Sequence, residues 1–155
     1  MVADLNLDMY VMVGKLQRIV AYGGEHSSLG EIAKRAATQL GLQVIPDPTP
    51  EEVIFVRSDQ YSFVREGVPS LFMVGRPGVV EAADVTKWLR TNYHSPQDDL
   101  SQPLDLESLA EFTRVHWLAG HMIANQNARP TWKPKDFFGD TFGKKRGRVT
   151  TSPRP

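Results

Sequence analysis

Two segments of the chain carry side chains that suit metal chemistry. His94 lies in segment 93–100 (YHSPQDDL), a loop that is braced by a proline and followed by paired aspartates. Asp8 ends an apolar, strand-like run in segment 6–9 (NLDM). A histidine and an aspartate from distant points of a chain are suitable ligands for a divalent metal. Two ligands do not complete a catalytic site, so the prediction depends on which residues accompany them.

The elements that must position these residues alternate between strands and helices. Segments 2–9 and 16–22 have the pattern of β-strands, and the second is closed by two glycines. A helix follows, for which Ser28 and Glu31 form a predicted capping box and Gly41 the stop. Its predicted apolar stripe consists of Leu29, Ile32, Ala33, Ala36 and Leu40.

The second half of the chain continues the alternation. A short helix is predicted over 61–66 with Gly67 as its stop, and the nearly all-apolar segment 68–74 predicts a strand that helices bury on both faces. Segment 81–90 is predicted to be partly helical. Asp105 is the predicted N-cap of the longest helix. The predicted apolar stripe of that helix consists of Leu106, Leu109, Ala110, Thr113, Trp117 and Ile123.

This order of elements predicts the α/β class, with a layered mixed sheet flanked by helices. In such sheets functional residues gather at strand ends and in the loops beyond them. Asp8, segment 58–61 and His94 all lie at such positions. We therefore expect them to belong to one site.

Composition narrows the class of protein. The 155 residues suffice for one domain, 41% of them are apolar, and 18 basic residues balance 18 acidic ones. This balance favours neither nucleic acid nor an acidic surface as a partner. The absence of cysteine excludes disulfides and thiolate zinc sites. No segment has the apolar length of a membrane span, and the N-terminus lacks the pattern of a signal peptide.

The chain divides into two unequal parts. Residues 1–142 carry the alternating elements and form the predicted domain. Residues 143–155 are basic and rich in proline and glycine, so we expect a disordered tail. We interpret its charges as those of a solvated tail, because the chain is neutral as a whole and has no nucleic-acid motif.

Four motifs occur in an order and spacing that resemble a known family. They are the segments 6–9 (NLDM), 57–63 (RSDQYSF), 67–72 (GVPSLF) and 93–99 (YHSPQDD). They resemble the C-terminal half of the co-catalytic dizinc aminopeptidases and glutamate carboxypeptidases, metallopeptidase family twenty-eight of clan MH. Glutaminyl cyclases and the inactive ectodomain of the transferrin receptor share that fold. The resemblance covers the chain from Val2 to about Phe142.

The resemblance implies a zinc-dependent exopeptidase, a hydrolase of peptide substrates. In the family, two zinc ions are held by a histidine, a bridging aspartate, a glutamate, an aspartate and a histidine. The motifs match Asp8 to the fourth ligand and His94 to the fifth, on different zinc ions. The zinc pair activates a water molecule, and a further glutamate acts as general base.

The same resemblance places the other three ligands and the base N-terminal to the Asp8 strand. We therefore expect the N-terminal part of the fold to be missing and the chain to be a truncated fragment. The adjacent pair Glu51 and Glu52 follows Asp8, and His26 and His116 lie in the wrong context for the first ligand. With two ligands the chain is expected to bind zinc weakly or not at all and to be inactive alone.

Several neighbouring residues have two interpretations. Asp98 and Asp99 orient the His94 ring as its hydrogen-bond acceptors, or they cap the following turn. Tyr61 faces the substrate pocket and supports the oxyanion, or it is a half-buried aromatic residue. Asp59 is interpreted as tying its own loop together through backbone hydrogen bonds, in support of the site. The tryptophans Trp88, Trp117 and Trp132 are expected to pack in the interior.

Two other functions stay open at the level of sequence. One is a non-catalytic binding or oligomerisation module, in which an exposed sheet edge and apolar face pair with a partner or with a second copy. The other is acyl transfer of the glutaminyl cyclase type, because the residues that decide between hydrolysis and cyclisation are expected in the missing half or in pocket loops. Relatives are often secreted or periplasmic, and the sequence leaves the compartment open.

Overall fold

The computed structural model describes residues 1–8, 14–78, 82–102 and 104–143. The predicted tail, apart from Gly143, lies outside these residues. The strands are β1 (Asp4–Asn6), β2 (Leu16–Tyr22), β3 (Gln43–Ile45) and β4 (Ser70–Pro77). The helices are α1 (Leu29–Gln39), α2 (Gln60–Arg65), α3 (Ala82–Thr91), α4 (Leu106–Asn125) and α5 (Phe137–Phe142), with 3-10 turns η1 (Pro50–Glu52) and η2 (Ile54–Val56).

The described strands form one mixed sheet in the order β1-β4-β2-β3. β1 runs parallel to β4, β4 runs antiparallel to β2, and β2 runs parallel to β3. The prediction of an α/β protein with a mixed sheet is confirmed. β4 is an interior strand of the sheet, and Leu71 on one face and Phe72 on the other are both buried, as its apolar sequence predicted.

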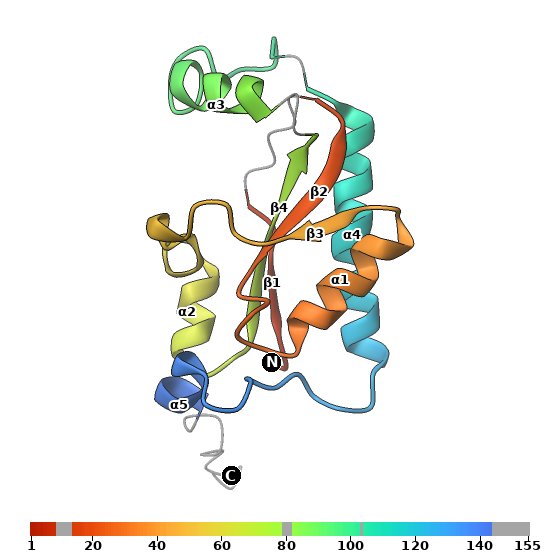
Figure 1. The fold of residues 1–155 in the computed structure, drawn as a ribbon, viewed down its shortest axis with the longest axis vertical. Coiled ribbons are helices and arrows are strands. Elements are labelled where there is room, and N and C mark those ends of the chain that lie inside the picture. The colour runs from red at the N-terminus through yellow and green to blue at the C-terminus, as the bar shows by residue number, and fades with distance from the viewer. Residues whose placement is uncertain (9–13, 79–81, 103, 144–155) are drawn as a thin grey trace, which may run out of the picture.

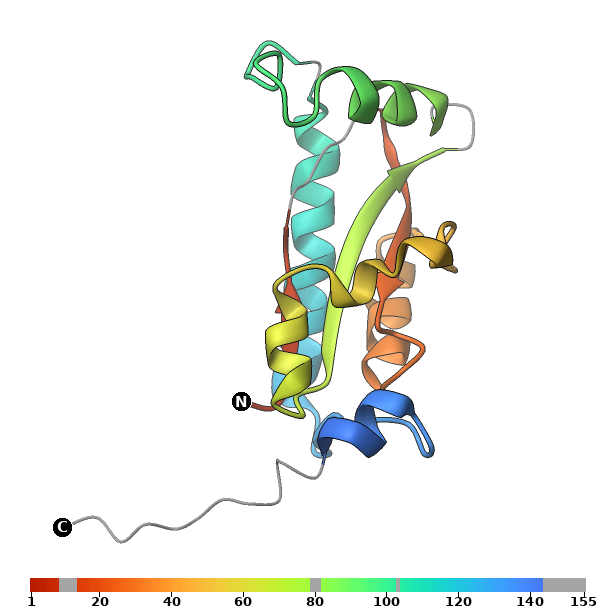
Figure 2. The same cartoon turned by 90° about the vertical axis from the view of Figure 1, so that its left-hand side faces the viewer.

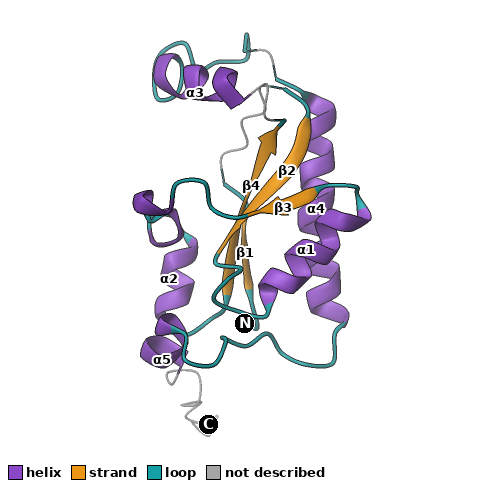
Figure 3. Ribbon diagram, in the orientation of Figure 1, coloured by secondary structure: helices purple, strands orange, loops and turns teal. Residues whose placement is uncertain are grey.

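Helices cover both faces of the sheet. α1 and α4 pack on one face, and α2 with α5 lies on the other (Figures 1 and 2). The segment 126–136 leads from α4 to α5 as a loop below the sheet (Figure 3), and Trp132 in this loop bridges to Ser27. α3 lies beyond the carboxyl end of β4 (Figure 1).

The start of α1 differs from the predicted capping box. Ser28 has helical backbone angles, and its side chain does not cap the helix. The Ser28 hydroxyl instead accepts a hydrogen bond from the backbone N–H of Thr131 at 3.0 Å. The Ser27 hydroxyl accepts one from the backbone N–H of Leu29 at 3.2 Å. Packing of the distant loop therefore redirected the side chain that local sequence assigned to the cap.

The buried face of α4 also differs from the predicted stripe. Leu106 and Trp117 are 67% and 64% exposed, so Trp117 does not pack in the interior, unlike Trp88. The face that meets the sheet contains Ser108, Phe112, Val115, His116, Ala119 and Ile123. One cause is the Ser108 hydroxyl, which accepts from the backbone N–H of Leu16 at 2.8 Å and so turns this side of the helix toward β2.

The predicted N-cap is confirmed, because the Asp105 carboxylate accepts from the Ser108 N–H.

Within the described residues, none of the helices has the length and apolar character needed to cross a membrane.

Candidate functional site

The loop after β1 is tied to the loop before α2 by hydrogen bonds between side chains. The Asn6 amide donates to the Ser58 hydroxyl oxygen at 3.2 Å, and this hydroxyl donates to Oδ2 of Asp8 at 3.1 Å. The same amide donates to Oε1 of Gln60 at 2.8 Å. The structure thus joins the first two of the four motifs, and the hydrogen bond to one of its oxygens orients the exposed Asp8 carboxylate.

Gln60 anchors this network; it lies in the segment 58–61 that the sequence assigned to the site, but no role of its own followed from the sequence. Its side chain is fully buried, and its amide donates to the backbone oxygen of Phe55 at 2.8 Å while its oxygen accepts from Asn6. A buried amide is stable only when its donors and acceptor find partners. The available signal was an amide residue that follows the apolar turn η2 after three polar residues, because the backbone carbonyls of such a turn need donors.

A cavity of about 350 Å³ lies beside Asp8. The sheet supplies residues from β2 and β4, and the remaining wall comes from α3 and the segment 52–58. The residues that line it are Asp8, Tyr22, Glu52, Ile54, Arg57, Ser58, Phe72, Val74, Gly75, Arg76, Val85, Leu89 and Tyr93. The cavity therefore joins the Asp8 strand end to the segment that carries His94.

His94 lies next to this cavity without lining it. Its side chain is exposed, its backbone has a positive φ of 57°, and its ring stacks on Tyr93 with a centroid distance of 3.7 Å. The loop is held by Gln102, whose Oε1 accepts from Trp88 at 3.1 Å and from Asn92 at 2.8 Å. The stacking and this hub hold the His94 loop against the end of α3.

The paired aspartates after His94 take part in turns. The Asp99 carboxylate accepts from the backbone N–H of Ser101 at 2.8 Å and from its hydroxyl, and these hydrogen bonds lower the pKa of Asp99. Asp98 contributes a backbone N–H, which donates to the Ser95 carbonyl. Within the described residues, neither carboxylate is hydrogen-bonded to the His94 ring. This geometry corresponds to the turn-capping interpretation of Asp99.

Two further residues of the predicted site lie away from the cavity wall. Tyr61 is half-buried and packs against the hydrophobic cluster between the sheet and α5, as in the second interpretation of its ring. Asp59 precedes α2, but its exposed side chain makes no capping hydrogen bond to that helix. The network around Gln60 holds this loop instead.

A zinc site depends on the donor side chains that the described residues bring together. No group of three or more histidine, aspartate or glutamate side chains there is arranged to hold a metal ion. Asp8 and His94 have suitable donor atoms and are both exposed. Protein zinc sites use at least three protein ligands, so the described residues do not form a zinc site by themselves.

Glu52 also differs from the general base of a peptidase. It lines the cavity, but its carboxylate oxygen lies 3.5 Å from the Arg57 guanidinium in an exposed ion pair. Its neighbour Glu51 is exposed as well.

Two other histidines, His26 and His116, make packing and polar contacts away from the cavity beside Asp8. His26 Nδ1 lies 2.7 Å from Oδ2 of Asp136 and Nε2 lies 3.3 Å from Glu25, between the rings of Phe55 and Phe138. Burial acts to lower the pKa of His26, but the two carboxylates outweigh it, and the pKa is raised. Burial lowers the pKa of His116, which lies in the α4–sheet interface.

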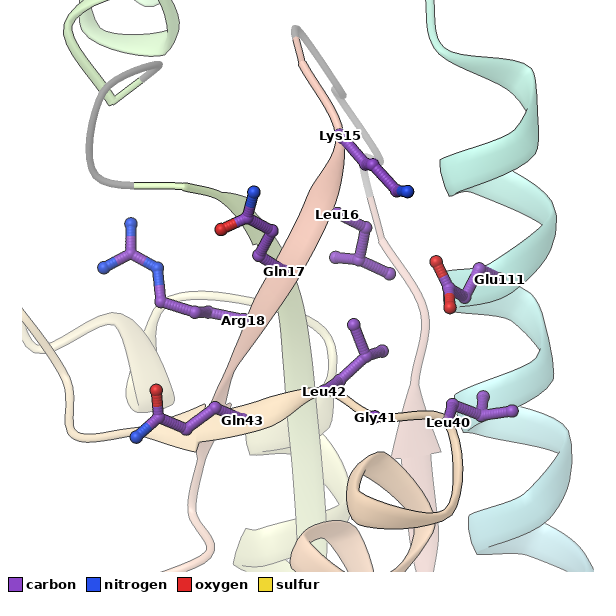
Figure 4. A pocket seen from close by; sticks show the side chains of 9 residues that line it. All are labelled: Lys15, Leu16, Gln17, Arg18, Leu40, Gly41, Leu42, Gln43 and Glu111. Atoms are coloured by element: carbon purple, nitrogen blue, oxygen red, sulfur yellow. The ribbon is translucent and has the colours of Figure 1, made fainter.

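A larger cavity, of about 640 Å³, opens between β2, β3 and α4 (Figure 4). Lys15, next to β2, and Glu111, on α4, line it together with Leu16 and Leu42. None of the predicted site residues lines it.

The mixed α/β sheet and the joined motifs are consistent with a peptidase fold, and the comparison with known proteins supports this class. The model of peptidase family M28 matches residues 1–119. The chain belongs to this family of hydrolases, which is generally zinc-dependent. A search of curated proteins and a search of solved structures each returned no match.

Proposed function

We propose that this chain supplies part of the active site of a zinc-dependent exopeptidase of the aminopeptidase type. In this proposal Asp8 and His94 each bind one of two zinc ions, and the cavity between their segments receives part of the peptide. The observation that carries it is the hydrogen-bonded chain from Gln60 through Asn6 and Ser58 to Asp8. An exposed carboxylate without a functional role has no need of such a buried support.

We further propose that the 155-residue chain is inactive by itself. Two ligands bind zinc weakly, and the described residues offer no third ligand beside them. The pair Glu51 and Glu52 does not replace the general base, because Glu52 is paired with Arg57. Activity then requires ligands and a base beyond those that the structure describes.

Zinc titration followed by NMR tests the assignment of the ligands. We expect ZnCl₂ to shift the ring signals of His94 and the backbone signals around Asp8, and His94→Gln or Asp8→Asn to remove the corresponding shifts. His121→Gln is the matched control, because His121 is also exposed but lies on α4. Shifts that follow His121 and survive both site variants would contradict the proposal.

A non-catalytic oligomerisation module is the second candidate. Within the described residues β1 pairs only with β4 and so leaves one edge open. Leu106 and Trp117 also expose apolar surface on α4. This candidate predicts a dimer in light scattering that Trp117→Ser weakens, whereas a monomer at all concentrations would count against it.

A further inference from the structure

Two buried donor groups without acceptors face the cavity beside Asp8. The Tyr22 side chain is 3% exposed, and its hydroxyl has no hydrogen-bond partner of ordinary geometry among the described residues. The Nε atom of the half-buried Arg76 is itself buried and also has no hydrogen-bond partner among the described residues. Both residues line the cavity. Buried polar groups in folded proteins are nearly always paired, so each exception calls for an explanation.

The sheet register explains how these donors come together. Val74 lies opposite Val20, and Tyr22 pairs with Phe72 two positions further along, so the Tyr22 hydroxyl and Arg76 extend from one face of the sheet. Burial raises the pKa of Tyr22, and the Arg76 guanidinium opposes that shift through hydrogen bonding and its charge, while the carboxylates of Asp47 and Glu52 add to it. Both groups can therefore donate to a single acceptor placed between them.

The paired arginines Arg76 and Arg18 favour an anion at that point, and the carboxylates of Asp47 and Glu52 act against it. Arg76 lies directly opposite Arg18 in the sheet, and like charges in such a pair repel each other. Arg18 donates from Nε and Nη2 to the Pro77 carbonyl at 3.0 and 2.7 Å, which engages part of its guanidinium but does not neutralise either charge. The Glu52 carboxylate, on the same cavity, is paired with Arg57.

The dimensions of the cavity suit part of a peptide. Its volume of about 350 Å³ lies at the small end of ligand pockets, which start near 300 Å³. Apolar side chains form much of its wall, namely Ile54, Phe72, Val74, Val85 and Leu89. Such a wall accommodates the carbon chain of an amino-acid residue while the arginine and the tyrosine meet its charged end.

We infer that this cavity binds a carboxylate group of a peptide, which accepts one hydrogen bond from the Arg76 guanidinium and one from the Tyr22 hydroxyl. The inference deepens the proposed function, because it assigns a substrate class to the cavity beside Asp8. The carboxylate belongs either to an acidic side chain or to the C-terminus of the peptide. Both sources present the same planar acceptor.

Peptide titration of the 155-residue chain tests this inference. Three probes are used in the presence of EDTA, namely Ala-Glu-Ala-amide, Ala-Gln-Ala-amide and Ala-Gln-Ala with a free C-terminus. We expect one of the two charged probes to bind at least about tenfold more tightly than the uncharged amide, as a charge-assisted hydrogen bond predicts. The probe that binds identifies the source of the carboxylate. Equal affinities for all three, or no binding, would overturn the inference.

Two variants connect the binding to the named donors. Tyr22→Phe is expected to weaken the charged probe about two- to tenfold without lowering the resistance to urea, because within the described residues the lost hydroxyl makes no hydrogen bond of ordinary geometry. Arg76→Gln is expected to weaken it more strongly, and Arg35→Gln, on the exposed side of α1, to leave it unchanged. An equal loss in the Arg35 variant would contradict the assignment. Because EDTA removes zinc, binding here is independent of the ligand roles of Asp8 and His94, and each proposal can fail alone.

Discussion

The substitution Gln60→Leu tests the buried network that orients Asp8. Leucine has a similar volume but no polar atoms, so it removes the 2.8 Å hydrogen bond to the Phe55 carbonyl and the 2.8 Å bond from the Asn6 amide. The longer contact of the Gln60 amide with the Ile54 carbonyl, at 3.5 Å, is weak by comparison. Two good hydrogen bonds are lost, and one buried carbonyl is left without its donor.

The expected cost follows from these contacts. An unpaired buried polar group costs about 1–3 kcal/mol, and a typical hydrogen bond contributes about 1 kcal/mol. Asn6 keeps Ser58 as a hydrogen-bond partner, so the loss of its bond to Gln60 costs an amount at the lower end of this range. We expect Gln60→Leu to lower the free energy of unfolding by about 3 kcal/mol, a large part of the roughly 5–15 kcal/mol of an ordinary domain.

Equilibrium unfolding in urea, followed by circular dichroism, measures this change. Gln39→Leu is the matched control, because Gln39 is exposed in α1 and leucine has a similar helix propensity. The control is expected to stay within about 0.5 kcal/mol of the native chain. A loss below about 1 kcal/mol for Gln60→Leu, similar to that of the control, would refute the role given to the network.

The remaining predictions concern residues outside the network. Because the pKa of His26 is raised in the folded state, its stabilising effect is complete below its ordinary pKa of 6.5 and is lost as pH rises through the folded-state value. His26→Gln should therefore cost about 1 kcal/mol in urea unfolding near pH 5.5 and less near pH 8.5, and an equal loss at both would contradict this. Gly23→Ala should cost about 3 kcal/mol or more, since φ is +89° and the new Cβ would lie 2.7 Å from the Ser70 carbonyl oxygen. Gly41→Ala, with a φ of +71° and open space, should cost only about 1 kcal/mol, so equal losses would argue against the steric cause. Asp105→Ala should lower the thermal stability by about 1 kcal/mol and Asp105→Ser by less, and no difference between the two would exclude a capping role.

Local sequence was sufficient for much of the fold. The bounds of β2, the stop of α2 at Gly67 and the N-cap of α4 at Asp105 follow from short-range patterns, and the structure has all three. β3 was not predicted, because three residues after a helix are too few to show an alternation.

Features that depend on distant contacts were beyond local patterns. α4 carries apolar residues on more than one side, so periodicity alone did not decide between Leu106 with Trp117 and Phe112 with Val115. In the structure, the hydrogen bond between the Ser108 hydroxyl and the backbone of β2 shows that the face with Phe112 and Val115 is turned toward the sheet.

The candidate site was predicted in part. The motifs that contain Asp8 and Ser58 are joined as their order suggested, and Gln60, which supports them, lies inside the second motif, but its supporting role depends on contacts with Asn6 and Phe55 that the sequence does not show. Tyr22 and Arg76 become a pair only through the antiparallel register of β2 and β4. Neither strand alone contains a signal for that cavity.

The zinc content of the purified 155-residue chain, measured together with hydrolysis of leucine p-nitroanilide, tests the central proposal most directly. The chain is dialysed against ZnCl₂ and then against metal-free buffer before elemental analysis. With Asp8 and His94 as ligands to different ions, we expect less than one retained zinc per chain and no hydrolysis. Two retained zinc ions per chain, together with hydrolysis that EDTA abolishes, would contradict the proposal.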